Sequence, residues 1–313
     1  MLPCKNWVVT PGVHGCTGVT SITACLGMIL AWQFGFKVLI AHLGRRGDGV
    51  EEMFAGHQPE LDMNHFNESS SVNPSSTLLP NGWDALQRLA VHGRLNPSLL
   101  ISCTIPVMRN LDILPGYDDS SLEAATATLN MTATHQQTQQ TIAALLEQGA
   151  LHYDIVLWAD NVRMQGSYAG GPKANKRVAE LIHNDVRSHL LHQIVVLPQQ
   201  KALIEQALVD QGRQGASAYV IGAYDEMARW NIANVRRKFK LPQPIFAMPY
   251  VTAYRNAHED GNMTTWFIRQ CQLYEKGKES ALVKHMLRLA QYVMQESGMN
   301  ERPAWTEGRD RSG

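Results

Sequence analysis

The sequence lacks a cysteine framework, an excess of charge of either sign and a long apolar run. Its five cysteines include no C-x-x-C pair, so neither a disulfide framework nor a zinc site is predicted. Lys plus Arg and Asp plus Glu number 28 each, so net charge argues neither for nor against binding to nucleic acid. The most apolar stretch, 22–36, is shorter than the ~20 residues that span a bilayer. These absences predict a cytoplasmic protein with reduced thiols, no metal site and no transmembrane segment.

Short apolar runs alternate with longer helical patterns along the chain. The first unit is a strand at 6–10, a glycine-rich loop, a buried helix at 19–34 and a strand at 37–41. Such a unit predicts parallel strands joined by a right-handed crossover. Further strands are predicted at 111–114, 153–158, 194–197, 219–221 and 245–248, and further helices at 81–90, 132–148, 173–184, 199–211, 226–238, 251–258, 263–270 and 278–296.

This alternation predicts an α/β fold with a doubly wound, mostly parallel sheet and helices on both faces. Because no linker clearly separates two units, a single domain is expected over 1–297, followed by a polar C-terminal tail at 298–313. The segment 44–80 is predicted to be irregular, since it is rich in Gly, Ser and Asn.

The loop after the first strand has glycines where a phosphate-binding loop would have them. Such a loop needs backbone N–H groups that turn inward, a helix N-terminus behind them, a Lys on the phosphates and a Ser or Thr on Mg²⁺. Residues 14–21 read His-Gly-Cys-Thr-Gly-Val-Thr-Ser. The backbone features are therefore present, but both lysines are missing.

This segment resembles the P-loop of the ParA/MinD family, K-G-G-x-G-K-T-T. His14 stands at the signature lysine, Val19 at the main phosphate lysine, and Cys16 replaces a glycine. Losing a lysine that contacts phosphate removes about 1.5–3 kcal/mol of charged hydrogen bonding, and it weakens stabilisation of the transition state most. The matching positions are Gly15, Gly18, Thr20 and Ser21.

The acidic positions of the family are also changed. Where the family reads V-L-L-I-D-x-D-P, this chain has His42 and Gly44 at the two acids. The segment 153–160 resembles the family's Y-D-x-x-I-I-D strand, with Ala159 at the acid. Asp160 comes one residue late, so its side chain should point to the other face of the sheet.

The resemblance continues over most of the chain. It extends to a divergent ParA/MinD-like group of pilus-assembly and mobile-element loci, similar to the pilus-localisation proteins TadZ and CpaE, in which the first loop reads H-G-x-x-x-x-T-S. No receiver-like domain of the kind that those proteins often carry is predicted within this sequence. The supporting segments are 82–86, 111–116, 222–225, 231–238, 248–250 and 261–267.

The resemblance implies a P-loop NTPase-like positioning or scaffold protein with a degenerate nucleotide site, serving a pilus, secretion or conjugation machine. A component of that machine would be its partner, and a homodimer could form through the loops 44–50 and 166–173. ATP or ADP with Mg²⁺ is the ligand of the family, but no cofactor is firmly predicted here. No catalytic residue and no metal ligand are assigned. The predicted nucleotide-binding residues are Gly15, Cys16, Thr17, Gly18, Val19, Thr20 and Ser21.

Several alternatives remain open. The chain could be an active, nucleotide-switched ATPase that uses a substitute such as Arg45 or Lys173. It could also be a DNA-binding partition protein that uses the basic run 236–240, although such a run is often a solvated helix end favoured by the helix dipole. His42 could be a general base. The apolar stripe within 282–293 could pack in the core or lie on a membrane surface.

Overall fold

The computed structural model describes residues 5–13, 18–47, 49–57, 82–117, 131–160, 186, 192–210 and 215–299. Within them one sheet runs in the order β3-β4-β2-β5-β1-β6-β7-β8. All neighbouring pairs are parallel except β3 and β4, which are antiparallel. The strands are β1 (Lys5–Pro11), β2 (Val38–His42), β3 (Ile105–Met108), β4 (Leu111–Leu114), β5 (Ile155–Ala159), β6 (His192–Leu197), β7 (Ala218–Tyr224) and β8 (Ile245–Pro249).

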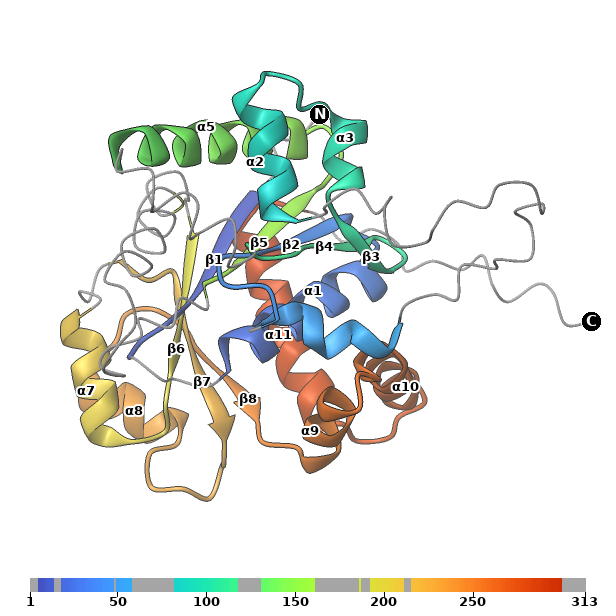
Figure 1. The fold of residues 1–313 in the computed structure, drawn as a ribbon. Helices are drawn as coiled ribbons and strands as arrows, with labels where there is room; N and C mark the ends of the chain where they lie inside the picture. The colour runs from blue at the N-terminus through green and yellow to red at the C-terminus, as the bar shows by residue number, and fades with distance from the viewer. Residues whose placement is uncertain are drawn as a thin grey trace, which may run out of the picture.

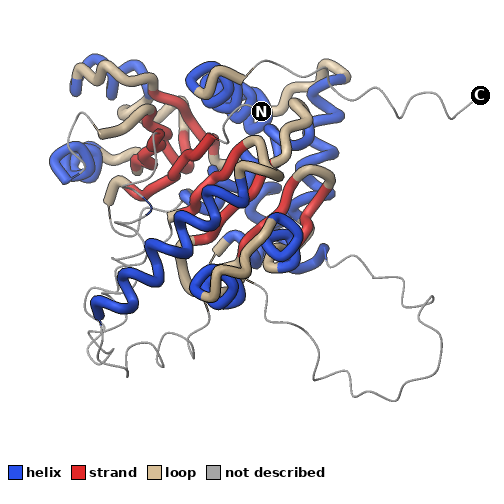
Figure 2. Tube along the Cα trace, turned by 90° about the horizontal axis from the view of Figure 1, so that it is seen from above, coloured by secondary structure: helices blue, strands red, loops and turns tan. Residues whose placement is uncertain are grey.

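Helices cover both faces of this sheet (Figures 1 and 2). One face packs against α1, α9, α10, α11 and the 3₁₀ helix η1, while the other packs against α2, α3 and α5 at one end and α7 and α8 at the other. The helices are α1 (Val19–Trp32), η1 (Val50–His57), α2 (Trp83–Val91), α3 (Pro97–Ser102), α5 (Met131–Gly149), α7 (Lys201–Asp210), α8 (Ile232–Phe239), α9 (Thr252–Glu259), α10 (Met263–Glu275) and α11 (Ala281–Glu296).

The central strands are apolar on both sides because helices cover both faces. In β1, Trp7 and Val9 face α1 and α11, whereas Val8 faces the other layer. Helix α1 lies close to the sheet: a Cβ added at Gly27 would come within 2.8 Å of the side chain of Ile40. This close approach explains why a glycine is found inside a buried helix.

The C-terminal end of helix α11 contacts the first strand, β1. The Trp7 indole N–H donates to Ser297 Oγ at 2.9 Å, and the ring stacks on His192 with centroids 4.4 Å apart. Tyr292 contacts the same indole edge-on. Residues from three distant parts of the chain therefore meet around one side chain.

The predicted fold class is confirmed, with differences in detail. Helix α8 begins at Ile232 rather than at 226, and α10 extends to Glu275. The elements η1, α3 and β3 were not predicted. The predicted helix 173–184 and most of the tail lie outside the described residues.

The apolar stripe of the last helix belongs to the core. Its side chains are at most 1% exposed and pack beneath the sheet, so the membrane-surface alternative for this helix is wrong. Within the described parts of the chain, no helix combines the length and apolar character needed to cross a bilayer. The residues of the stripe are Leu282, Met286, Leu289 and Val293.

Candidate functional site

The candidate site lies where neighbouring parallel strands end. Strands β2, β5 and β1 are adjacent and parallel, so His42, Asp160 and the loop after Pro11 are at the same edge of the sheet. Ligands of open α/β sheets bind at this carboxyl edge. His42 and Asp160, two residues that the sequence singled out, therefore follow neighbouring strands at one edge of the sheet.

The loop that resembles a phosphate loop is only partly described. His14, Gly15, Cys16 and Thr17 lie outside the described residues. Gly18 opens α1 with φ of 128°, a backbone conformation that favours glycine. Thr20 and Ser21 follow, half-buried, in the first turn.

The Val19 side chain lies in the hydrophobic core. Its side chain is 3% exposed and packs with the α1 cluster. A lysine at this position would carry its ammonium group to a phosphate, whereas valine has neither the length nor the charge. The position at which the family has its main phosphate lysine is therefore apolar in this structure.

His42, the last residue of β2, is buried and paired. It is 1% exposed, and its Nδ1 lies 2.9 Å from Oε1 of Glu51 in η1. The same carboxylate oxygen accepts a hydrogen bond of 2.7 Å from the backbone N–H of Gly116, just after β4. Glu51 therefore links three separate segments: the end of β2, η1 and the loop after β4.

Three glycines enclose the His42 ring, and we call Gly44, Gly49 and Gly116 the glycine cage. A Cβ at Gly49 would overlap the imidazole carbon Cε1, and one at Gly44 would lie 2.5 Å from Nε2. A Cβ at Gly116 would lie 3.0 Å from Nδ1 and would overlap the carbonyl oxygen of Gly44. Side chains at these positions would occupy the space that the ring fills.

The electrostatics favour an ionised Glu51. Burial alone would raise the pKa of Glu51, but the hydrogen bond and charge of His42, with the N–H of Gly116, outweigh burial and lower it. Each side chain of the pair has one further polar atom, His42 Nε2 and Glu51 Oε2. Both atoms are buried without a hydrogen-bond partner among the described residues. A Glu that orients a His resembles a general-base pair, but here Nε2 is packed against the glycine cage.

The Asp160 side chain is also buried and hydrogen-bonded. It is 1% exposed, and its Oδ2 accepts a hydrogen bond of 2.7 Å from the hydroxyl of Thr10 on β1. The neighbouring Ala159 packs in the cluster on the α1 face, whereas Trp158 belongs to the opposite layer. Asp160 follows the parity of Trp158, as the one-residue shift predicts.

The described cysteines are not candidate nucleophiles. Cys25, Cys103 and Cys271 are free thiols and buried. Burial raises the pKa of Cys271 to about 12 and also raises that of Cys25. A thiol held protonated is a poor nucleophile and a poor metal ligand. Among the described residues, no group of three His, Cys, Asp or Glu could hold a metal ion.

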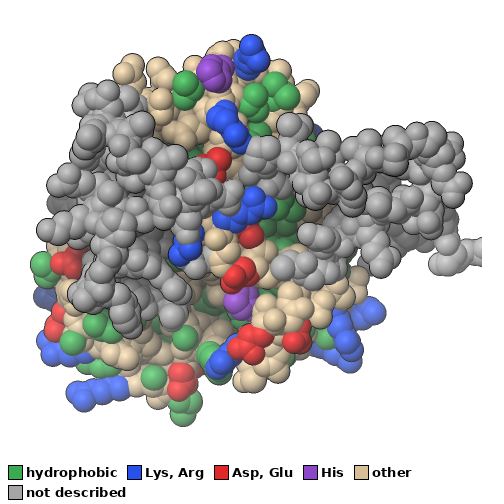
Figure 3. Space-filling view, in the orientation of Figure 1, with side chains coloured by type: hydrophobic (Ala, Val, Ile, Leu, Met, Phe, Trp, Pro, Cys, Tyr) green, Lys and Arg blue, Asp and Glu red, His purple; other side chains and the backbone are tan. Residues whose placement is uncertain are grey.

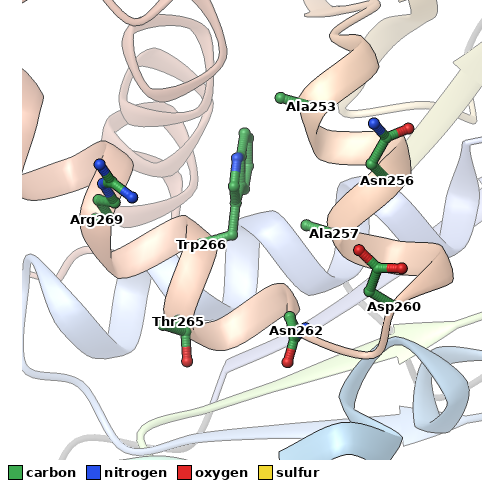
Figure 4. Close-up of a pocket in the computed structure, with 8 residues that line it drawn as sticks. All are labelled: Ala253, Asn256, Ala257, Asp260, Asn262, Thr265, Trp266 and Arg269. Carbon is green, nitrogen blue, oxygen red and sulfur yellow. The ribbon is translucent and has the colours of Figure 1, made fainter.

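A separate hollow of about 520 Å³ lies between α9 and α10 (Figure 4). Trp266 stands between the two helices, and Ala253 and Ala257 point toward it. None of its lining residues comes from the loop that resembles a phosphate loop. The remaining lining residues are Asn256, Asp260, Asn262, Thr265 and Arg269.

Sequence reasoning missed the partner of His42. The signal that could have found Glu51 is the spacing of His42, Gly44, Gly49 and Glu51: a histidine followed by a glycine-rich loop and then an acid. Gly116 comes from a distant segment. The loop 44–50, proposed as a dimer contact, is in this structure also the wall of the His42 site.

Comparison with solved structures reveals the fold. No protein-family model and no curated protein sequence matches the chain. The septum site-determining protein MinD of Pyrococcus horikoshii, complexed with Mg-ADP, has 17% identity and a TM-score of 0.56, covering 94% of this chain and 98% of that one.

Two further structures are similar over nearly their whole length. The MinC:MinD cell division protein complex of Aquifex aeolicus has 16% identity and a TM-score of 0.56, covering 96% of this chain and 99% of that one. A plasmid partition protein of Borrelia burgdorferi has 12% identity and a TM-score of 0.51, covering 85% and 99%. At such identities the likeness establishes the fold, which is a single-domain α/β P-loop NTPase fold of the MinD type.

Proposed function

We propose that this chain is a ParA/MinD-like positioning or scaffold protein whose nucleotide site no longer supports ATP hydrolysis. The MinD-like fold supports the general class, because one similar structure is a septum site-determining protein. The sequence resemblance to TadZ and CpaE supports a pilus, secretion or conjugation machine as its partner. The observation that carries the loss of hydrolysis is the fixed, buried pair of His42 with Glu51.

Three positions that hydrolysis needs in the family carry unsuitable side chains. Val19 is in the core, His42 is enclosed by the glycine cage, and Ala159 is apolar and buried. Oriented charged donors at the transition state are the largest single contribution in phosphoryl transfer. Among the described residues, the start of α1 still offers its backbone amides and the hydroxyls of Thr20 and Ser21, so Gly15 to Ser21 stays a predicted anion-binding loop.

A catalytic Mg²⁺ does not fit the described residues. Mg²⁺ prefers carboxylate and water oxygens in octahedral geometry. At the first acidic position of the family, this chain presents an imidazole, and the nearby carboxylate of Glu51 is held by His42 and Gly116. Asp160 is bonded to Thr10 on β1. No step of the proposed function therefore depends on a metal ion.

Purified chain incubated with Mg-ATP is expected to release phosphate at the rate of the buffer alone, because neither phosphate lysine is present. The measurement is steady-state phosphate release over a range of protein concentrations. Thr20→Ala, which removes the hydroxyl at the position of the family's Mg²⁺ ligand, serves as the matched control. Steady turnover that disappears in Thr20→Ala would overturn the proposal and favour the switched-ATPase alternative.

If the chain forms a dimer, the dimer should not require ATP. His14 replaces the lysine that reaches the partner's phosphates in the family, and an unperturbed imidazole is mostly neutral at pH 7. The contact must then rest on apolar and hydrogen-bonded surfaces of roughly 1,200–2,000 Å² in total. Sedimentation with and without ATP tests this. A monomer that dimerises only when ATP is added would contradict it.

A further inference from the structure

A short basic surface lies on and around α8, and we call it the α8 basic surface. It consists of Arg229, Arg236, Arg237, Lys238 and Lys240, all of which are exposed. The segment 229–240 contains no acidic residue, although the whole chain carries equal numbers of acidic and basic side chains. Charge of one sign is therefore concentrated locally.

The five cations are not neutralised within the described structure. The close acid–base contacts of His42 with Glu51, Lys201 with Glu205, and Arg255 with Glu259 lie elsewhere in the described structure. None of them involves the α8 basic surface. Its charges are therefore available to a partner.

Part of this surface is held in a fixed geometry. The Asn234 side chain donates to the carbonyl oxygen of Arg229 at 2.7 Å and accepts a 2.9 Å hydrogen bond from the Arg237 guanidinium. The Arg229 guanidinium lies 5.8 Å from the centroid of the Trp230 ring, a cation–π arrangement. Two arginines are thus oriented before any partner binds, which lowers the entropy cost of binding.

Lys240 adds an observation that helix stability alone does not explain. It ends α8 in the left-handed region, with φ of 50°, where glycine is the usual residue because it has no Cβ. Cations in the last turn of a helix interact favourably with the helix dipole. This interaction accounts for Arg236, Arg237 and Lys238. The dipole accounts neither for Arg229, before the helix, nor for a lysine at a strained position.

We infer that the α8 basic surface binds an acidic segment of a protein partner, with the arginines pairing to carboxylates. Arginine forms bidentate bonds with carboxylates. Two acidic side chains, Asp225 and Glu226, lie in the loop that leads to Arg229 and α8. A long polyanion such as DNA that ran on past Arg229 would meet these acids, whereas a short acidic segment can end before them.

The size of the surface fits a compact partner. In Figure 3, outside the grey atoms, basic and acidic side chains are interspersed on the visible face. Helix α8 spans eight residues, or about 12 Å. This inference rests on the proposed function, because it gives the chemistry of the partner that a positioning protein must bind.

The probe is a fluorescent glutamate-rich peptide, with a glutamine-rich peptide of equal length as its control, titrated with the purified chain in the absence of nucleotide. The glutamate peptide should bind, more weakly as salt rises, and the glutamine peptide should not. The double variant Arg236→Glu/Arg237→Glu should lose at least about tenfold in affinity. Lys201→Glu, a single charge reversal on α7, should leave the affinity nearly unchanged, whereas Arg237→Glu alone should lower it.

Lys240→Gly separates binding from helix stability. Removing the strained Cβ should raise the melting temperature or leave it unchanged, while peptide affinity falls several-fold. If the surface binds no partner, Lys240→Gly should affect only the melting temperature and leave peptide affinity unchanged. That result would overturn the inference. So would tighter binding to random-sequence duplex DNA or to phosphatidylserine vesicles than to the peptide. ATP turnover would refute the proposed loss of hydrolysis but would leave the peptide measurements standing, so the two failures are distinguishable.

Discussion

Gly49→Ala is expected to lower the free energy of unfolding by roughly 1–3 kcal/mol or more, as overpacking of a filled site does. The new methyl group would overlap Cε1 of the His42 ring and lie 2.6 Å from Nδ1. The ring cannot easily move away, because Glu51 holds Nδ1 and Gly44 lies against Nε2. Urea unfolding of the variant and of the parent chain measures the loss.

Two controls make this prediction specific. Gly149→Ala, at the end of α5, meets only ordinary contacts at 4.0 Å, so it should leave stability unchanged or raise it by up to about 1 kcal/mol. His42→Ala removes the obstructing ring, so Gly49→Ala should be far less harmful in that background, with strong non-additivity. Equal losses in both backgrounds would show that the glycine is needed for its backbone alone.

Glu51→Ala is expected to destabilise the chain by about 1–3 kcal/mol or more, the range for leaving a buried polar group without its hydrogen-bond partner. The glutamate side chain is 11% exposed and that of His42 0%, so solvent cannot replace the lost acceptor. The substitution also leaves the Gly116 N–H without its acceptor. Glu51→Gln keeps an acceptor oxygen but not the charge, and should cost less than the alanine variant.

The same pair gives stability a defined dependence on pH. The folded pKa of Glu51 lies below its ordinary value of 4.5, so the ionised carboxylate favours the folded state. Its contribution is fully present above about pH 4.5 and is lost as pH falls through the lowered folded pKa. Unfolding free energy measured across this window should fall more steeply for the parent chain than for Glu51→Gln. Identical slopes would mean that folding does not lower the pKa of Glu51.

Strongly apolar elements could be read from the sequence, because their patterns do not depend on distant contacts. Buried strands such as β2 and β5 appear as continuous apolar runs, and the stripe of α11 has helical spacing. The missing phosphate lysine could also be read directly, because Val19 falls within a recognisable motif. These features need only local information.

The partners of His42 were not predicted, because tertiary contacts bring them together and only the spacing of His42, Gly44, Gly49 and Glu51 gives a local signal. Glu51 lies in a segment without helical or strand periodicity, and Gly116 follows a different strand. The start of α8 moved for a similar reason: the Gln199 side chain bonds the backbone of Asp225 and Trp230, which holds 226–231 as a loop. β3 was not predicted because it is a four-residue edge strand that contains Pro106. A proline in a short apolar run argues against a strand in sequence analysis.

The contacts of Trp7 have a consequence for the order of folding. This residue of the first strand is completed by His192, Tyr292 and Ser297, so its native surroundings cannot form until nearly all of the described chain has been synthesised. Sequence-distant contacts of this kind slow folding, because long loops must close before the contacts are made. During translation, the N-terminal strand therefore leaves the ribosome long before its partners. A large apolar indole remains exposed in that interval, and such exposed surface is where aggregation of nascent chains begins.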